Sequence, residues 1–146
     1  MTHKLSLRPG TTNDLGLLAE MNYRLIEDEK SANPMTIEQL RKRMQGWLES
    51  TYHAVPFERA DGVIGYALYR FEDETFGKRR VVYLRQFFVG RAYRGQGWGQ
   101  QAFGELRRDF FREAYVKLEV LTTNSSGLAF WQRLGFEPYA VTMALK

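Results

Sequence analysis

The sequence predicts a single mixed α/β domain. Apolar residues recur at helical intervals of three and four in the first third of the chain. The middle third instead holds runs rich in β-branched and aromatic residues, which favour strands. The 146 residues match the length of one domain and contain no internal repeat or linker, so we treat 1–146 as one unit.

The first third predicts one short strand and two helices. Leu5 and Leu7 alternate with polar residues before Pro9-Gly10 ends the strand. Residues 11–14 and 36–39 each have the spacing of a capping box, which marks a helix start. The apolar stripes of the two helices are Leu15, Leu18, Met21 and Leu25, and then Ile37, Leu40, Met44 and Trp47 or Leu48.

The rest of the chain predicts five more strands and two more helices. Strands are expected over 52–58 and 63–71, joined by a hairpin turn at Asp61-Gly62, and over 81–89 after a polar stretch. A helix carrying Ala102, Phe103, Leu106 and Phe110 follows a glycine-rich loop. A strand over 116–121, a short helix from Asn124 to Gly135 and a closing strand over 139–145 complete the order β-α-α-β-β-β-α-β-α-β.

Composition excludes several classes of function. The chain has no cysteine, so disulfides, thiolate zinc sites and a cysteine nucleophile are excluded. Its two histidines are too few for a histidine-based metal site, and a carboxylate site is not excluded, although we expect no metal. It has neither a bilayer-length apolar stretch nor a signal-peptide pattern, so we expect a cytoplasmic protein without membrane contact. The net charge of +4 permits polyanionic ligands but selects none.

The glycine-rich loop is the most informative segment. Gly95, Gly97 and Gly99 alternate between a predicted strand and a predicted helix, with Arg91 and Arg94 beside them. Glycines allow backbone to approach a ligand closely, and the first amides of a helix lack internal partners. The pattern favours a phosphate cradle over a simple turn.

Two other phosphate loops fit less well. A Walker loop requires Gly-Lys-Ser/Thr, which is absent after Gly97. The dinucleotide fingerprint is matched in relaxed form by Gly97, Gly99 and Ala102, but it should adjoin its strand, and here several residues intervene after Val89.

A third interpretation is a family resemblance. Arg94-x-x-Gly97-x-Gly99 resembles the Arg/Gln-x-x-Gly-x-Gly/Ala signature of the GCN5-related N-acetyltransferases (GNAT). Farther along, Asn124 together with residues 130–136 looks like the second signature of that family. The resemblance implies a mostly antiparallel central sheet with helices on both faces, and acetyl-CoA as co-substrate with no metal.

The resemblance also implies which residues bind acetyl-CoA. The pyrophosphate would lie on the amides of residues 95–100, the pantetheine arm would run along residues 87–89, and Asn124 would contact that arm unless it serves only as a helix N-cap. The predicted cofactor-binding residues are Phe87, Phe88, Val89, Arg94, Gly95, Gln96, Gly97, Trp98, Gly99, Gln100 and Asn124.

Acetyl transfer to an amine needs a proton acceptor, because an alkylammonium ion has no lone pair. Glu119 lies five residues before Asn124, a spacing similar to the general base of the ribosomal-protein alanine N-acetyltransferases in this family; a solvent-facing strand carboxylate is the alternative. The usual tyrosine acid of the family is replaced by Trp131, for which we expect core packing, since an indole cannot deliver a proton. Tyr93 and Tyr139 are nearby in sequence.

The acceptor side is predicted from acidic residues at the end of the first helix. Glu27, Asp28 and Glu29 oppose the helix dipole there, so they either attract a cationic amine or form a solvated helix end. Tyr83 is a further candidate on the acceptor side. The basic runs 78–80 and 107–108 form either a solvated face or a contact with the 3′-phosphate of the cofactor, and no nucleic-acid motif accompanies them.

The sequence therefore predicts an N-acetyltransferase that joins acetyl-CoA and a primary amine by direct attack in a ternary complex. The partners are acetyl-CoA and the acceptor amine, with no nucleic acid and no membrane. The alternative is a non-catalytic acyl-CoA sensor. The identity of the amine and the oligomeric state, a homodimer included, stay open.

Overall fold

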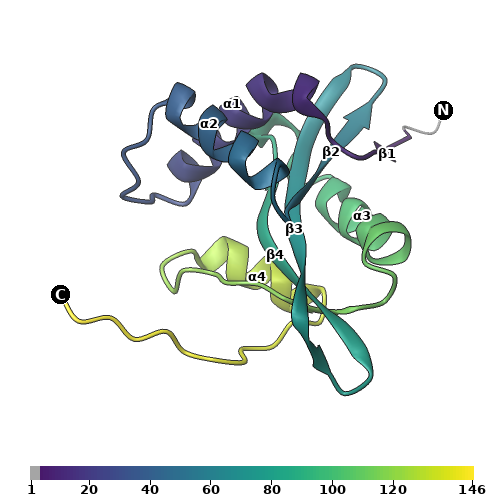
Figure 1. The fold of residues 1–146 in the computed structure, drawn as a ribbon, viewed down its shortest axis with the longest axis vertical. Coiled ribbons are helices and arrows are strands. Elements are labelled where there is room, and N and C mark those ends of the chain that lie inside the picture. Colours follow the sequence, from purple (N-terminus) through teal and green to yellow (C-terminus); the bar gives the residue numbers. More distant parts are fainter. Residues whose placement is uncertain (1–3) are drawn as a thin grey trace.

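A five-stranded sheet forms the centre of the structure, a computed structural model that describes residues 4–146 (Figure 1). The strands lie side by side in chain order, as β1 (Ser6–Leu7), β2 (His53–Arg59), β3 (Gly62–Phe76), β4 (Arg79–Val89) and β5 (Tyr115–Lys117). The pairs from β1 to β4 are antiparallel, and β5 runs parallel to β4. The prediction of a mixed, mostly antiparallel sheet is confirmed.

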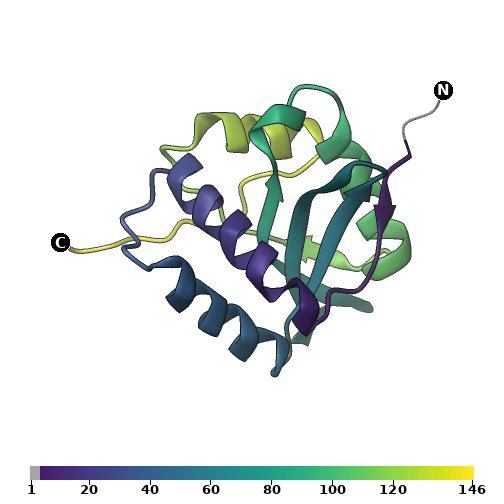
Figure 2. The same ribbon diagram turned by 90° about the horizontal axis from the view of Figure 1, so that it is seen from above.

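Helices cover both faces of this sheet, as predicted. Helices α1 (Leu15–Asp28) and α2 (Ile37–Leu48) lie together on one face, and α3 (Trp98–Glu105) lies on the other (Figure 2). Helix α4 (Ser125–Arg133) follows β5. A π-helical turn over Leu106–Phe110 continues α3, and short 3-10 turns at Thr12–Asp14 and Arg91–Tyr93 precede α1 and the glycine loop.

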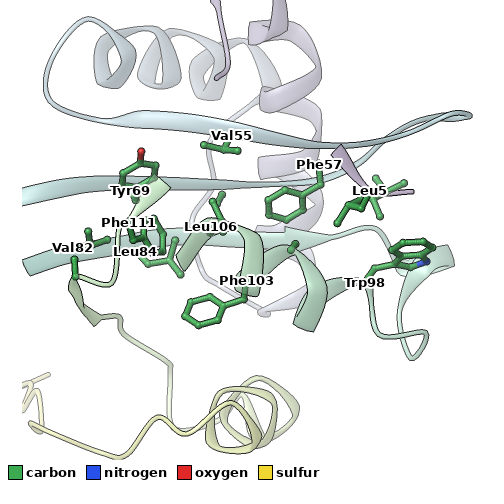
Figure 3. Packing of buried hydrophobic residues seen from close by; sticks show 14 residues of the cluster. Leu5, Val55, Phe57, Tyr69, Val82, Leu84, Trp98, Phe103, Leu106 and Phe111 are labelled. Carbon is green, nitrogen blue, oxygen red and sulfur yellow. The ribbon is translucent and has the colours of Figure 1, made fainter. Parts of the chain in front are cut away.

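Each face of the sheet has its own hydrophobic core. Under α1 and α2, the side chains of Leu18 and Met44 pack with Tyr66 and Phe88 from the sheet. Under α3, a second cluster joins sheet residues such as Phe57 and Leu84 to helical residues, and is drawn in Figure 3. The two cores fix β3 and β4 as the central strands, from which the site described below is built.

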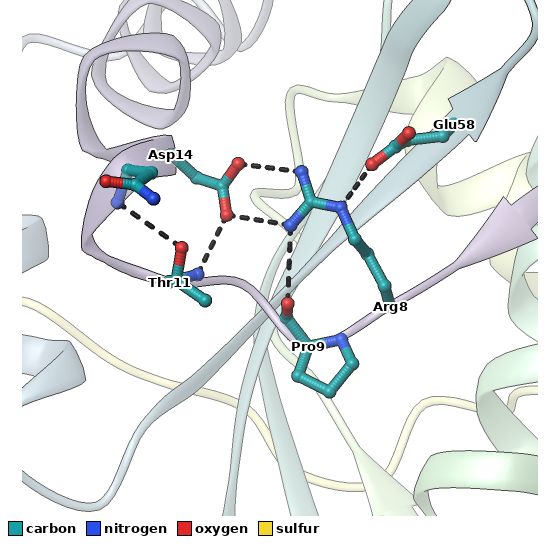
Figure 4. A network of polar contacts seen from close by, with 6 residues as sticks. Arg8, Pro9, Thr11, Asp14 and Glu58 are labelled. Atoms are coloured by element: carbon teal, nitrogen blue, oxygen red, sulfur yellow. Dashed lines mark hydrogen bonds and ion pairs between the residues drawn. The ribbon is translucent and has the colours of Figure 1, made fainter.

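Both predicted capping boxes form. The Thr11 hydroxyl accepts from the Asn13 amide at 3.3 Å, and the Asp14 carboxylate accepts from the Thr11 amide at 2.8 Å. Asp14 also receives two hydrogen bonds of 2.8 Å from Arg8, whose guanidinium pairs with Glu58 on β2 as well (Figure 4). At α2, Thr36 and Gln39 exchange the corresponding contacts at 2.9 and 3.2 Å.

The hairpin between β3 and β4 is longer than predicted. The polar stretch after residue 71 stays in the strand up to Phe76, and the chain turns at Gly77, whose φ is +63°. Two contacts beyond the core support this extension: Phe76 stacks on Tyr115 with centroids 4.2 Å apart, and Lys117 pairs with Glu74 at 2.8 Å.

Two predictions near the carboxyl end are corrected. The strand expected over 116–121 ends at Lys117, because the chain then diverges from β4. The closing strand expected over 139–145 does not form: residues 137–146 are exposed and run away from the body of the molecule (Figure 1). The alternating pattern is suited to a strand, but within residues 4–146 no strand lies beside this stretch to supply hydrogen bonds.

No helix in the part of the chain that the structure describes is long and apolar enough to cross a membrane. Within residues 4–146 there is also no cluster of three or more side chains suited to a metal ion.

Candidate active site

A cleft of about 850 Å³ opens where the chain after β5 diverges from β4. One wall is the end of β4 together with the glycine loop and the start of α3, and the opposite wall is residues 119–120 and α4. The end of α1 closes one side through Leu25, Asp28 and Glu29. The cleft brings together the segments that the sequence singled out.

The glycine loop adopts a conformation that side chains would oppose. Gly95 and Gly97 have φ values of +73° and +87°, in the left-handed region. A Cβ at Gly99 would lie 3.1 Å from the ring of Phe130, so the loop also packs closely against α4. Glycine is therefore favoured by the backbone angle at two positions, and at the third a side chain would require the Phe130 ring to shift by a few tenths of an ångström.

The amides that follow this loop are available to a ligand. Helix α3 begins at Trp98, and its first internal bond is from the Gln101 amide to the Gly97 carbonyl, at 3.0 Å. Across residues 4–146, the amides of Trp98, Gly99 and Gln100 donate to no backbone carbonyl. Free amides at the positive end of a helix beside a close-packed glycine loop fit a diphosphate.

An ion-pair cluster ties the loop to the end of α1. Asp28 accepts hydrogen bonds from both Arg91, at 2.8 Å, and Arg94, and Arg94 also donates to the Val89 carbonyl at 2.7 Å. Burial would raise the pKa of Asp28, but the two arginines outweigh it and lower that pKa. The carboxylate of Asp28 is thus already neutralised by the protein.

The end of β4 offers backbone to the cleft. Phe87, Phe88 and Val89 pair with β3 on one edge, whereas β5 pairs only with residues 81–83 of β4, so among the described residues no strand pairs with the other edge of 87–89, where the Val89 carbonyl accepts from Arg94. All three line the cleft, although the side chain of Phe88 is buried. A Cβ at Gly65 would lie 2.0 Å from the Phe88 carbonyl, so Gly65 allows β3 to approach here; the sequence analysis missed this role.

The Glu119 carboxylate lines the cleft and is held by a residue from β4. The Tyr83 hydroxyl donates to its Oε1 at 2.6 Å, and Tyr83 itself stays outside the cleft. Burial, followed by the bond to Glu119, raises the pKa of Tyr83 to about 12, so this hydroxyl stays protonated at neutral pH. One carboxylate oxygen is therefore fixed, and the other is free to meet a substrate.

Of the three predicted acids at the end of α1, Glu29 is the one that offers an unneutralised carboxylate to the cleft. Burial, and then the charge of Asp28, raise the pKa of Glu29. It forms no hydrogen bond or ion pair with the residues that the structure describes. Glu27 is exposed and lies outside the cleft.

Of the remaining predicted cofactor-binding residues, Asn124 and Trp98 line the cleft and Gln96 does not. Asn124 lines the cleft and is also the N-cap of α4, where its side chain accepts from the Gly127 amide at 3.0 Å. Trp98 contributes backbone, because its side chain is buried in the core under Arg59. Gln96 does not line the cleft; its side-chain amide donates to the Ala92 carbonyl at 3.1 Å.

Trp131 packs in a group of aromatic rings, in agreement with the expected core role. Its ring centroid lies between 4.8 and 5.6 Å from those of four phenylalanines, mostly edge to face. These are Phe87, Phe103, Phe130 and Phe136. The group joins α3, α4 and β4 and supports the floor of the cleft.

Several cleft residues were missed by the sequence analysis. They lie on α1 and α4 and include Leu25, Ser126, Gly127, Phe130, Arg133 and Leu134. The spacing of four between Phe130 and Leu134 marked one helical face, but the same spacing is typical of ordinary core packing. Gly127 could have been predicted to lie near the site, because the amide three residues after an N-cap donates to the capping side chain, here Asn124.

The sheet, the two layers of helices and the glycine loop beside an open cleft match what the family resemblance implies for the fold. A sequence profile of the Acetyltransferase (GNAT) family matches residues 20–136. The chain belongs to this family, so the resemblance seen in the sequence is confirmed, and the protein is an acetyltransferase.

Individual relatives agree with this assignment. The thialysine N-ε-acetyltransferase of Bos taurus is 29% identical over 140 residues, which cover 88% of this chain and 82% of the relative. The fold is shared with a predicted acetyltransferase of Clostridium acetobutylicum solved with acetyl-CoA (TM-score 0.76, 16% identity, 98% and 96% of the two chains). It is also shared with an aminoglycoside N-acetyltransferase solved in complex with CoA (TM-score 0.79, 14% identity, 100% and 96%).

Proposed function

We propose that this acetyltransferase uses acetyl-CoA and transfers the acetyl group to a primary amine by direct attack while both substrates are bound. One observation carries the proposal: the free amides of residues 98–100 line the same cleft as the carboxylate of Glu119. A site for a diphosphate and a site for a proton thus share one cavity. The absence of cysteine from the sequence supports direct attack, because a cysteine acyl intermediate is excluded.

The chain would hold the acyl donor along one wall. The amides of residues 98–100 would bind the pyrophosphate, and the open edge of residues 87–89 would run beside the pantetheine arm. Acetyl-CoA supplies the activated acetyl group as a thioester. A backbone N–H in 87–89 would polarise the thioester carbonyl, since a fixed donor is most effective where negative charge develops.

The opposite wall would supply the proton acceptor. We assign this role to Glu119, with Tyr83 fixing Oε1 so that Oε2 meets the amine directly or through a water molecule. The reaction forms a C–N bond, breaks the C–S bond and leaves a thiolate that must be protonated. Trp131 cannot return that proton, because an indole N–H is not acidic. Of the two tyrosines near in sequence, Tyr93 lines the cleft and is the candidate for this proton transfer, whereas Tyr139 lies in the exposed terminal segment.

The acceptor is proposed to enter beside Glu29. A partly buried carboxylate without a cationic partner among the described residues attracts an ammonium group, whereas Asp28 is already paired. The names of the bovine and murine relatives place their chemistry on the ε-nitrogen of thialysine, which supports an amine on a flexible alkyl chain.

The test is a screen for thiol release from acetyl-CoA in the presence of amines of several classes: thialysine and lysine, peptide N-termini, polyamines and aminoglycosides. We expect amine-dependent release of thiol. Glu119→Gln should lower kcat by about 10²-fold or more, because proton transfer by a positioned group contributes about 10²–10⁴. The matched control, Glu27→Gln, removes an exposed acid outside the cleft and should leave kcat unchanged.

Calorimetry with CoA separates the alternatives. Binding of CoA to wild type and to Glu119→Gln with equal affinity supports the assignment of Glu119 to the chemical step. Tight CoA binding without thiol release for any amine would instead identify an acyl-CoA sensor. No heat with CoA would remove the basis of the proposal.

A further inference from the structure

Two arginines lie together over one aromatic ring on the face of the sheet that α1 and α2 cover. The guanidinium carbons of Arg43, on α2, and Arg85, on β4, lie 4.4 and 4.9 Å from the centroid of the Trp47 ring. Arg85 also lies over the ring of Tyr52, at 5.8 Å, and donates to its hydroxyl at 3.3 Å. The aromatic rings therefore hold two cations close to each other.

No acidic side chain balances this pair of charges. Among residues 4–146, neither Arg43 nor Arg85 forms an ion pair. Arg43 donates to the fully buried side chain of Asn22 at 3.2 Å, but its Nε is buried without an acceptor. Burial, and then the charge of Arg85, lower the pKa of Arg43. Such a pair of cations destabilises the protein alone, and a bound anion would offset that repulsion.

The backbone of β4 is irregular at Arg85. Residues 68 and 69 of β3 pair with residues 86 and 84 of β4, so Arg85 is an extra residue that has no partner on the neighbouring strand. A β-bulge of this kind changes the direction of a side chain and is common beside active sites. Arg85 is exposed, so its guanidinium is accessible to a ligand while the rings of Trp47 and Tyr52 hold it in place.

Arg85 lies next to the proposed proton acceptor. It comes two residues before Phe87, the first residue of β4 that lines the cleft. The Tyr83 hydroxyl, which donates to Glu119 at 2.6 Å, is also near Arg85, because the charge of Arg85 opposes the increase that burial and Glu119 cause in the pKa of Tyr83. A molecule that reaches Glu119 from this side therefore passes Arg85.

Arg43 lies near the acid at which we propose that the acceptor enters. Burial raises the pKa of the Tyr66 hydroxyl, the charge of Arg43 opposes this increase, and the charge of Glu29 adds to it. Arg43 and Glu29 are thus both close to one buried hydroxyl. The two arginines and the two acids of the acceptor side, Glu29 and Glu119, consequently occupy neighbouring parts of the same face of the sheet.

We propose that Arg43 and Arg85 bind a carboxylate of the acceptor, so that the acceptor belongs to the amino-acid class and carries a primary amine and a carboxylate in one molecule. This inference rests on the proposed function and specifies its substrate. A guanidinium can bind a carboxylate through two parallel hydrogen bonds, and a ring that holds the guanidinium in place reduces the cost of ordering it. Acceptors that carry only positive charge, such as polyamines, would lack this contact and would be repelled by the two cations.

Direct binding tests the carboxylate site without turnover. Lysine and lysinamide, which carries a neutral amide in place of the carboxylate, are each titrated into the protein in the presence of CoA and followed by calorimetry. We expect lysine to bind the wild type about tenfold or more tightly than lysinamide, because hydrogen bonds to charged groups are strong. Arg85→Gln should bring this ratio close to one. The control Arg41→Gln removes an exposed arginine of α2 and should keep the ratio. Equal affinities in the wild type, or no binding of lysine, would overturn the proposal.

Kinetics separate this inference from the proposed function. Thiol release is measured with lysine and with 1,5-diaminopentane, which is lysine without its carboxylate. Arg43→Gln and Arg85→Gln should each raise the KM for lysine about tenfold or more, with little change in kcat and none in the KM for the diamine. A wild type that acetylates the diamine as efficiently as lysine would keep the proposed function and overturn the carboxylate site. If no amine releases thiol, the proposed function fails, and the binding ratio still decides the carboxylate site.

Two other roles of the arginines give different results. Weaker CoA binding by both variants, with an unchanged preference for lysine over lysinamide, would assign the arginines to the phosphates of the cofactor. A lower melting temperature with that preference unchanged would limit them to packing against Trp47 and Tyr52. Either result would overturn the proposal. Because Arg85 is exposed, Arg85→Gln should fold even if Arg43→Gln, which loses its bond to Asn22, does not.

Discussion

At the scale of single residues, two neighbouring acids have opposite environments. The Asp28 carboxylate is bonded to Arg91 and Arg94, and its pKa is lowered in spite of burial. Glu29 is partly buried and has no cationic partner among the described residues, and burial raises its pKa. Asp28 therefore stabilises the loop. The ionised carboxylate of Glu29 lowers the stability of the folded state and is available to bind a cationic substrate.

Glu29→Gln should raise stability and weaken function. A folded-state pKa above the ordinary value of 4.5 means that the ionised carboxylate disfavours folding, so at pH 7 the wild type bears this cost and the variant does not. We expect a higher melting temperature at pH 7, and a difference that shrinks as the pH falls below the raised pKa. The KM for the amine should rise while CoA affinity stays constant. A lower melting temperature at pH 7 or an unchanged KM would contradict this role.

Trp131→Phe should leave kcat within a few-fold of wild type. The ring lies among four phenylalanines, and phenylalanine conserves most of its edge-to-face packing. Steady-state kinetics together with a melting curve provide the check. A hundredfold or greater loss of kcat in a folded variant would show that the indole N–H takes part in the reaction.

At the scale of elements, the turn from β4 to α3 prepares the site before any ligand binds. Its glycines accept positive φ at residues 95 and 97 and close contact at residue 99, and the Arg94 side chain fixes the loop to the Val89 carbonyl. The helix amides are thereby held in place, so binding need not order them. A preorganised loop of this kind reduces the entropy lost on association.

Gly97→Val should abolish CoA binding in a domain that still folds. A β-branched residue at φ +87° is strongly disfavoured, so the loop must change conformation and move its amides. Gly104→Ala is the matched control: it lies inside α3, and an added Cβ meets no atom within 4 Å. The control should bind CoA normally and gain up to about 1 kcal/mol of stability. Undiminished CoA affinity in Gly97→Val, measured by calorimetry, would rule out the cradle.

The helices and hairpins were well predicted where a local rule sets them. The capping boxes at Thr11 and Thr36 form because both partners are within three residues of each other. The predicted end of β5 was wrong because apolar and charged residues alternate from Val116 to Val120 without a break, and nothing local marks where the chain must leave β4. Strand length depends on the neighbouring strand, which a sequence window does not contain.

At the scale of the whole molecule, Arg8 joins parts of the chain that are distant in sequence. Its guanidinium binds Asp14 at the start of α1 and Glu58 on β2, so the edge of the sheet, the helix cap and the second strand are held together (Figure 4). The hydrogen bonds from Arg8, with further bonds from Thr11, keep the pKa of Asp14 below its ordinary value despite burial.

Asp14→Asn should lower the free energy of unfolding by about 1–2 kcal/mol at pH 7, the usual range for a lost cap and charged hydrogen bond. Because the folded-state pKa of Asp14 is depressed, its contribution is present above pH 4 and is lost as the pH falls through that lowered pKa. Urea unfolding at pH 7 and pH 3 should show the difference between variant and wild type shrinking in acid. A difference that is independent of pH would exclude the ion pair as its source.

The sequence by itself determined the glycine loop, the caps, the apolar faces of the first two helices and the family, because each depends on residues close together in the chain or on a fixed motif. Only the tertiary structure showed that Tyr83 holds Glu119, that Asp28 is already paired while Glu29 is free, and that the terminal segment finds no strand beside it. Each of these depends on which groups from distant segments share a small volume, and periodicity and spacing carry no information about such contacts.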